Sequence, residues 1–207
     1  MAFPVACNGE QNHVGWAIDA GVKINLQGWG GMFGTGDDLI VTGVYSQSAV
    51  WYSGLLDGMW GEAGQTNGNG QPMFLADAFF NPINNQWSTP RAWSVSALLE
   101  HHWTPTIYTD LEGSIGELNW SGMNGNVGGV GTGVLSPHTI TWLVGADLGW
   151  NPVTNLNFDL ELMYQGVNQD KPNAAVGTVF NNGAFLPGAW DGNSGGFQGR
   201  FRVTRYF

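Results

Sequence analysis

Apolar and polar residues alternate without a break between residues 14 and 26 of the chain. The apolar positions are Val14, Trp16, Ile18, Ala20, Val22, Ile24 and Leu26. Successive side chains of a β-strand point to opposite faces, so this segment predicts a strand with one apolar and one polar face. Strands of soluble domains commonly have about 5–6 residues, whereas a tilted strand needs about 9–11 residues to cross a bilayer. Length and alternation together indicate a transmembrane β-barrel.

The same alternation recurs along the chain. Clear runs lie at 93–103, 107–115, 140–150, 156–164 and 197–207, and weaker ones lie near 39–47 and 73–80. With the first segment these make about eight strands, and the ambiguous stretch 50–72 leaves room for another. We therefore expect an all-β, antiparallel transmembrane β-barrel of about 8–10 strands, with residues 1–207 forming a single domain.

The composition agrees with strands that face lipid on one side and water on the other. Charged residues make up 11% of the 207 residues, against roughly 25% in an average soluble domain. No run of 18 apolar residues is present, so the sequence predicts no transmembrane helix. The formal net charge of −10 argues against a nucleic-acid partner, because little in the chain neutralises phosphates.

The connections between the expected strands are short on one side and long on the other. Trp103-Thr104-Pro105 and Trp150-Asn151-Pro152 form similar units, offset by 47 residues, and predict tight turns. Proline has no N–H to donate, so it ends a strand ladder. Longer stretches rich in Gly and Asn lie at 121–137 and 169–195. This asymmetry is typical of outer-membrane barrels.

The tryptophans mark the ends of the apolar runs. Trp93 and Trp103 are ten residues apart on one face of the expected strand. At about 3.3 Å per residue and a tilt of about 40°, they are separated by roughly 25 Å along the membrane normal, which matches the apolar band of such barrels. We expect an aromatic girdle at the membrane interface, formed by Trp93, Trp103, Trp142 and Trp150.

The charged side chains alternate with the apolar ones and are therefore expected to face a water-filled lumen. The predicted pore-lining residues are Asp19, Lys23, Glu100, His102, Asp110, Glu112, Asp147, Asp159, Glu161, Arg200 and Arg202. Carboxylates predominate among them, which favours a mild preference for cations. Solvation of the lumen without any selectivity is the simpler interpretation of the same residues.

Several patterns that resemble catalytic or metal sites do not meet the requirements of that chemistry. In Glu100-His101-His102 the two histidines point to opposite faces of a strand, so they do not share a metal ion. The G-x-S-x-G pattern at 192–196 lacks a preceding strand and a following helix. Carboxylate pairs such as Asp159 and Glu161 lack a nucleophile or a lid. We expect no enzymatic activity, no catalytic residues, no metal and no cofactor.

Five stretches of the chain carry a resemblance to a known family. They are GWAIDAGVKINL (15–26), WYSG (51–54), RAWSVSALLEHHWTP (91–105), GSIGELNW (113–120) and GRFRVTRYF (199–207). Together they resemble the alphaproteobacterial porin family found in rhizobia and their relatives. The resemblance spans most of the chain but only the C-terminal half of such a porin, and Arg205 stands where many outer-membrane proteins have an aromatic residue.

The resemblance implies a part of a sixteen-stranded barrel that assembles as a homotrimer in the bacterial outer membrane. Its partners are lipid and the small hydrophilic solutes and ions that diffuse passively through a water-filled channel. Phe207 resembles the C-terminal signal for membrane insertion. The loop that narrows the pore belongs to the N-terminal half of the family, and we find no counterpart of it in this sequence.

Other interpretations of the sequence stay open. The first fifteen residues contain neither a basic nor an apolar region, so they do not form a signal peptide, and we expect a mature chain or a fragment of a wider pore. Cys7 has no second cysteine to pair with. The 11 Trp and 5 Tyr residues also suit a soluble carbohydrate-binding β-sandwich. A small closed barrel with a structural or adhesive role is a further alternative.

Overall fold

The computed structural model describes residues 14–54, 79–81, 86–119, 138–169, 179–180, 183–184 and 193–207. Its elements are β1 (Trp16–Asn25), β2 (Asp38–Gln47), the 3₁₀ turn η1 (Val50–Ser53), β3 (Phe79–Asn81), β4 (Gln86–Ser88), β5 (Arg91–Thr104), β6 (Ile107–Asn119), β7 (His138–Val153), β8 (Leu156–Gln169), β9 (Val179–Phe180), β10 (Gly183–Ala184) and β11 (Asn193–Arg205). No helix among these residues is long and apolar enough to cross a membrane.

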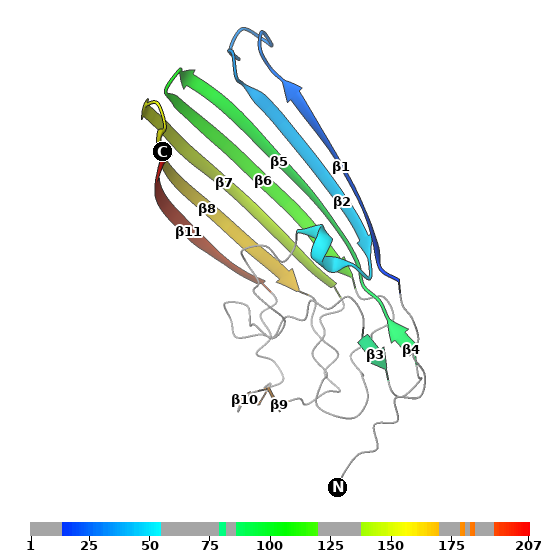
Figure 1. Ribbon diagram of the computed structural model, residues 1–207. Coiled ribbons are helices and arrows are strands. Elements are labelled where there is room, and N and C mark those ends of the chain that lie inside the picture. Colours follow the sequence, from blue (N-terminus) through cyan, green and yellow to red (C-terminus); the bar gives the residue numbers. More distant parts are fainter. Residues whose placement is uncertain are drawn as a thin grey trace.

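Seven long strands form one open, curved, antiparallel sheet (Figure 1). Their order is β1-β2-β5-β6-β7-β8-β11, so each strand pairs with its neighbours along the chain once the two small two-stranded ribbons are set aside. The prediction of an all-β, antiparallel chain is confirmed. The weak run expected near 73–80 lies mostly outside the described residues, and Phe79 and Phe80 belong to β3 rather than to the large sheet.

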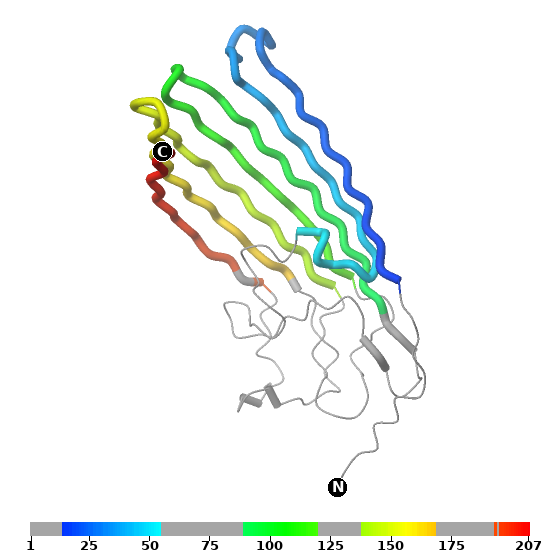
Figure 2. The backbone as a smooth tube through the Cα atoms, viewed as in Figure 1, coloured from blue at the N-terminus to red at the C-terminus, as the bar shows by residue number. Residues whose placement is uncertain are grey.

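The two ends of the sheet differ in the length of their connections (Figure 2). At the short-turn end, Pro105–Thr106 joins β5 to β6, Thr154–Asn155 joins β7 to β8, and the C-terminus follows β11. At the opposite end, which we call the long-connection end, residues 48–90, 120–137 and 170–192 separate strands that are neighbours in the large sheet. The connection 26–37 between β1 and β2 also lies at the short-turn end and is longer than the two tight turns beside it.

The prediction that Trp150-Asn151-Pro152 forms a tight turn is wrong. β7 continues through Pro152 to Val153, and its pairing with β8 shifts between Trp150 and Val153. A bulge places Pro152 where no ladder hydrogen bond is needed, so the proline does not end the strand. The turn itself has Asn155 at φ 64°, a conformation that asparagine tolerates.

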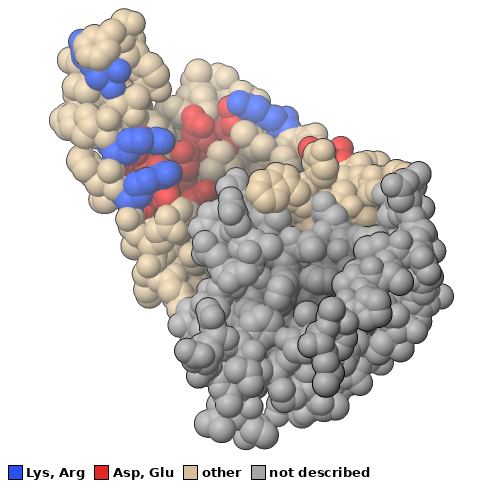
Figure 3. All heavy atoms as spheres, turned by 60° about the horizontal axis from the view of Figure 1, so that its bottom comes forward, with Lys and Arg blue, Asp and Glu red and all other residues tan. Residues whose placement is uncertain are grey.

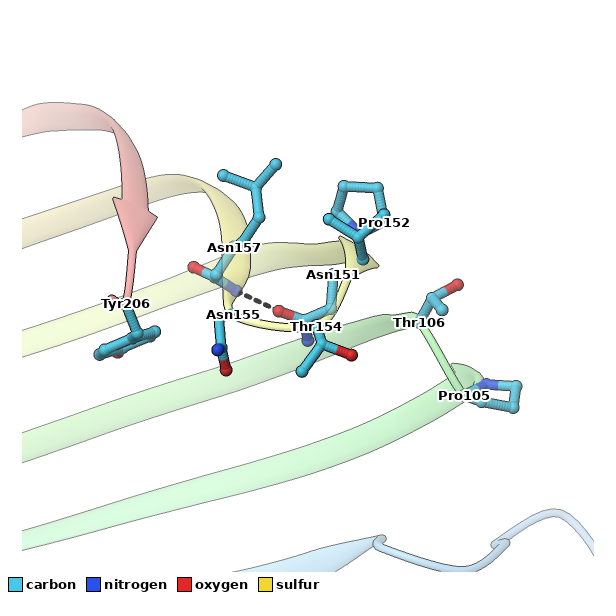
Figure 4. Close-up of a pocket in the computed structure, with 10 residues that line it drawn as sticks. Pro105, Thr106, Asn151, Pro152, Thr154, Asn155, Asn157 and Tyr206 are labelled. Carbon is cyan, nitrogen blue, oxygen red and sulfur yellow. Dashed lines mark hydrogen bonds between the residues drawn. The ribbon is translucent and has the colours of Figure 1, made fainter.

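Hydrogen bonds join the residues around these short connections, and Figure 4 shows the one between Asn157 and Asn151. The Asn151 amide donates to the Thr106 carbonyl over 2.8 Å, and the Tyr206 amide donates to the Asn155 carbonyl over 2.9 Å. The side chain of Asn157 donates to Asn151 Oδ1 over 3.0 Å. This end of the sheet is therefore fixed by backbone contacts between neighbouring turns and the C-terminal segment.

The described residues form only a small apolar core. Its buried members are Leu26, Ala49, Val50, Ala92, Leu118 and Val167. Of the ambiguous stretch 50–72, residues 50–53 form η1, and Tyr52 and Ser53 line a hollow of about 230 Å³ together with Ser94 and Ser114 of the sheet. Residues 55–72 lie outside the described part of the chain, as does Cys7.

Candidate functional site

The concave face of the sheet carries the charged side chains, and we call it the polar face. Figure 3 shows acidic groups gathered in a hollow with basic groups on both sides. By the register of the strands, all eleven residues predicted to line a pore lie on this face: Asp19, Lys23, Glu100, His102, Asp110, Glu112, Asp147, Asp159, Glu161, Arg200 and Arg202.

Five carboxylates lie in register on five neighbouring strands, and we call them the acidic row. They are Asp38, Glu100, Asp110, Asp147 and Glu161, each the cross-strand partner of the next. Directly opposite side chains on a sheet have Cβ atoms about 4.5–5.5 Å apart, and like charges at such positions destabilise the sheet. The row is therefore a strong concentration of negative charge.

Cations neutralise only the two ends of the acidic row. Lys23 Nζ lies 2.8 Å from Asp38 Oδ2 at one end. At the other end Arg200 donates to Glu161, its cross-strand partner. No lysine or arginine pairs with Asp110 or Asp147 among the described residues, so the middle of the row has no such cation beside it.

A second ion pair continues the charged surface toward the short-turn end. Arg202 donates to Asp159 Oδ2 through Nε over 3.2 Å and through Nη2 over 3.1 Å. The Tyr108 hydroxyl donates to Asp159 Oδ1 over 3.1 Å and accepts from Asn157. The Tyr108 ring lies across Gly149, where any Cβ atom would collide with the ring. Asp159 is thus held by groups from β6 and β11.

Parts of the acidic row are buried without a partner. Asp110 Oδ1, Asp147 Oδ1 and Glu161 Oε1 have neither solvent contact nor a hydrogen bond within the described part of the chain. Glu161 itself is only 6% exposed. No three His, Cys, Asp or Glu side chains among the described residues converge closely enough to hold a metal ion. The carboxylates form an extended line instead of a compact cluster.

The convex face, which we call the apolar face, has the opposite character. Leu160 and Leu162 on β8 are 55% and 57% exposed, whereas Asp159 and Glu161 beside them are 5% and 6% exposed. Across the middle of β1, β2, β5, β6 and β7 this face carries only aliphatic side chains and glycine, and β8 and β11 add Tyr164, Phe197 and Phe201. Exposed large apolar residues on it include Ile18, Val22, Val95, Leu111, Ile115, Val144 and Leu148.

Aromatic residues lie at both ends of the apolar face. Near the long-connection end, the Trp142 ring lies 5.3 Å from Tyr164, which lies 4.5 Å from Phe197. Trp93 is on this end of β5. Near the short-turn end, Trp150 stacks on Phe158 at 5.3 Å, and Trp103 donates to Thr109. The four tryptophans predicted to form a girdle thus divide into two pairs, one at each end.

The confinement of charge to one face has exceptions, all near strand ends. Glu117 lies on the apolar face, where it accepts from Trp93 Nε1 over 2.9 Å and lies 3.1 Å from His138 Nε2. The apolar face also carries Arg91, His101 and Arg205. The alternating sequence pattern did not indicate a role for Glu117. Glu117 lies two residues after Ile115 and therefore on the same face of the strand. Phe207 follows the end of β11 and is fully exposed.

Asp37 joins the β1–β2 connection to the end of β5. Its buried carboxylate accepts from the His102 amide and from His101 Nδ1, both over 2.7 Å, and from the Gly34 amide over 2.8 Å. Burial by itself raises the pKa of this carboxyl, but these hydrogen bonds and the attraction to His101 outweigh burial, so the pKa lies below its ordinary value. His101 and His102 occupy opposite faces of β5.

Sequence reasoning missed Asp37 and Asp38. Both lie just before the weak run 39–47. Asp38 is an even number of residues from the polar-face positions of that strand, so alternation alone could have placed it on the polar face. No sequence pattern indicated Asp37, because two of its three hydrogen-bond donors lie on a strand more than 60 residues away.

No protein-family model, no curated protein and no solved structure matches the chain. The geometry of the two faces is therefore the basis for the assignment that follows.

Proposed function

We propose that this sheet is a section of the wall of an outer-membrane porin, a water-filled channel for the passive diffusion of small hydrophilic solutes and ions. The observation that carries the proposal is that one face of the sheet is apolar and the other is charged. An apolar face exposed over seven strands suits lipid, and a charged concave face suits water. Contiguous exposed apolar surface of this extent is uncommon on soluble monomers.

The aromatic residues at both ends of the apolar face support the same orientation. Trp and Tyr are enriched at the two membrane–water interfaces because one part of each ring system is apolar and the other is polar. The exceptions on the apolar face, Glu117 among them, also lie near strand ends, where a charged group reaches water. Its bond to Trp93 fits such a boundary.

The direction of the edge strands indicates what would complete the wall. Six antiparallel pairings separate β1 from β11, so these two strands run in the same direction. Pairing β1 with β11 would be parallel, whereas the strands of membrane barrels are antiparallel. Unpaired edge N–H and C=O groups are not tolerated in lipid. We infer that an odd number of further strands closes the barrel, which argues against a small barrel made of these seven strands alone.

The carbohydrate-binding sandwich has less support. A sandwich packs two sheets with their apolar faces together. The described residues contain one large sheet, and its apolar face is exposed. We therefore retain the porin as the single proposed function, with no catalytic residue assigned.

Detergent dependence is the first test of this proposal. We expect the purified chain to bind detergent and to aggregate when detergent is removed, because its apolar face loses its solvent. A monodisperse, folded monomer in plain buffer would contradict the proposal.

Planar-bilayer recording tests transport in assemblies whose sheet edges are paired. We expect ion currents whose reversal potential under a KCl gradient shows a preference for cations, because carboxylates outnumber cations on the polar face. An anion preference, or a closed assembly that carries no current, would contradict it.

A further inference from the structure

We propose that two adjoining hollows on the polar face form a binding site for a neutral sugar. This inference deepens the proposed function and rests on its claim that the polar face meets water. One hollow, of about 230 Å³, lies between η1 and the sheet, and the other, of about 370 Å³, lies nearer the middle of the strands. Both are lined by Thr42, Ser96 and Ser114, so they form one continuous groove, which we call the η1 groove.

Hydroxyl groups line one side of the η1 groove. Thr42, Ser96 and Ser114 lie directly opposite one another on β2, β5 and β6. The other residues with hydroxyl groups that line the hollow against η1 are Tyr52, Ser53, Ser94 and Thr141. A hydroxyl group both donates and accepts hydrogen bonds, as each hydroxyl group of a sugar does. Among the described residues, none that lines the hollow against η1 is charged, so this part of the groove suits a neutral ligand.

Apolar side chains line the other side of the groove, and they point independently to a sugar. Ile40 and Leu98 are cross-strand partners one row nearer the short-turn end, and Leu143 is the partner of Ser114. All three are half-buried on the face that also carries the acidic row, where partly exposed apolar side chains are an informative exception. A pyranose ring has the same division, with C–H groups on its faces and hydroxyl groups around its edge. Glu112, the partner of Leu98, adds an acceptor for a sugar hydroxyl.

The 3₁₀ turn η1 forms a fixed wall of the groove. It lies against β2 and β5 at the long-connection end (Figure 1). Val50 is 1% exposed, and Ser53 Oγ donates to the Val50 carbonyl over 2.6 Å. Trp51 and Tyr52 both remain 69% exposed, and of these two only Tyr52 lines the groove. An exposed aromatic ring on a fixed wall packs against the apolar face of a sugar at little cost in conformational entropy.

Calorimetric titration of the full chain tests this site, in micelles of a detergent without a sugar headgroup. The probes are cellobiose, which has two pyranose rings, and sorbitol, which has similar hydroxyl groups but no ring. We expect cellobiose to bind at least about tenfold more tightly than sorbitol, because only a ring presents an apolar face to Ile40 and Leu98. Absence of cellobiose binding, or sorbitol binding of equal affinity, would overturn the proposal.

Two aromatic residues of η1 provide a matched pair of variants. We expect Tyr52→Ala to weaken cellobiose binding by about tenfold, because it removes the ring that lines the groove. Trp51→Ala removes an equally exposed ring that does not line it, and we expect no measurable change in affinity. Circular dichroism verifies that both variants are folded. Equal effects of the two substitutions would overturn the proposal.

A second pair of variants tests the apolar side of the groove. Leu98→Ser removes an apolar lining residue, and we expect it to weaken cellobiose binding by about tenfold. Met163→Ser makes a similar change on the polar face of β8, outside the lining of both hollows, and is expected to leave the affinity unchanged. Unchanged affinity of a folded Leu98→Ser variant would overturn the assignment of this side.

The outcomes separate this inference from the proposed function. Ion currents with cation preference but no cellobiose binding would remove the sugar site alone. Cellobiose binding to the groove without currents from a closed assembly would remove transport and leave the site.

Discussion

At the scale of single residues, Asp37 shows how one buried carboxylate fixes a long connection. It accepts three hydrogen bonds, from Gly34 in the connection and from His101 and His102 on β5. Hydrogen bonds to a charged group are stronger than neutral ones. The connection 26–37 is therefore held against β5 instead of extending freely from β1 and β2.

Replacement of this carboxylate tests that role. We expect Asp37→Ala to lower the free energy of unfolding in detergent micelles by about 2–3 kcal/mol, because buried donors lose a charged acceptor. Denaturant titration measures this loss. Asp19→Ala is the control, since Asp19 is exposed and substitutions of this kind stay within about 0.5 kcal/mol. Equal stability of the two variants would contradict the assigned role.

The pH dependence of the same contribution follows from the pKa. The pKa of Asp37 in the folded chain lies below its ordinary value of 3.8. Its contribution is therefore complete above that ordinary value and is lost as the pH falls through the lower pKa of the folded chain. We expect the difference in stability between the unmodified chain and Asp37→Ala to stay constant from pH 7 to about pH 4 and to shrink as the pH is lowered further. A difference that stays constant below about pH 4 as well would be inconsistent with the assignment.

Gly149 provides a test of packing on the polar face. Gly149→Ala places a methyl group against the Tyr108 ring, and we expect it to lower the free energy of unfolding by about 1–3 kcal/mol. At Gly113 an added Cβ meets nothing closer than 3.7 Å, so Gly113→Ala is expected to be neutral or slightly stabilising. Denaturant titration measures the free energy of unfolding of both variants. A larger loss of this free energy for Gly113→Ala than for Gly149→Ala would refute the explanation.

At the scale of strands, alternation predicted the long elements well. β5, β6, β7 and β8 contain the runs identified in the sequence, β1 lies within the run 14–26, and β11 covers the run 197–207 as far as Arg205. These runs were predictable because a strand's side-chain period is local information. The register between strands is not local. Bulges near Trp103 and Pro152 shift the pairing, and the two tight turns are offset by 49 residues instead of 47.

The same distinction explains what was missed at the site. The face of the strand on which each side chain lies was predictable from alternation, so the eleven residues were correctly placed on one face. Their alignment into the acidic row depends on every connection between β2 and β8, including the long ones, and no local pattern encodes it. The hydrogen bonds of Asp37 depend on tertiary contacts in the same way.

Adjacent residues of β8 allow a test of the two faces within one strand. We expect Leu162→Lys to destabilise the chain in lipid or detergent by about 2–4 kcal/mol, because a lysine at mid-height of the apolar face meets hydrocarbon. Met163→Lys places the same charge on the polar face beside carboxylates and is expected to be tolerated. Denaturant titration in micelles compares the two. A harmless Leu162→Lys would indicate that the convex face meets water.

At the scale of the whole molecule, the open sheet is incomplete as a membrane structure. Its edges β1 and β11 run in the same direction, and both need antiparallel partners. Each face has a different solvent in our account, with lipid against the apolar face and water against the polar face. That assignment underlies the porin proposal.

Nitroxide labelling of β8 in lipid vesicles tests this assignment most directly. Labels are attached to cysteines introduced one at a time at positions 159 to 164, in a chain whose Cys7 is replaced by serine. We expect labels at 160, 162 and 164 to collide mainly with oxygen, which concentrates in lipid. We expect labels at 159, 161 and 163 to collide mainly with a water-soluble nickel reagent. Equal access of the nickel reagent to both sets would mean that the two faces do not meet different solvents.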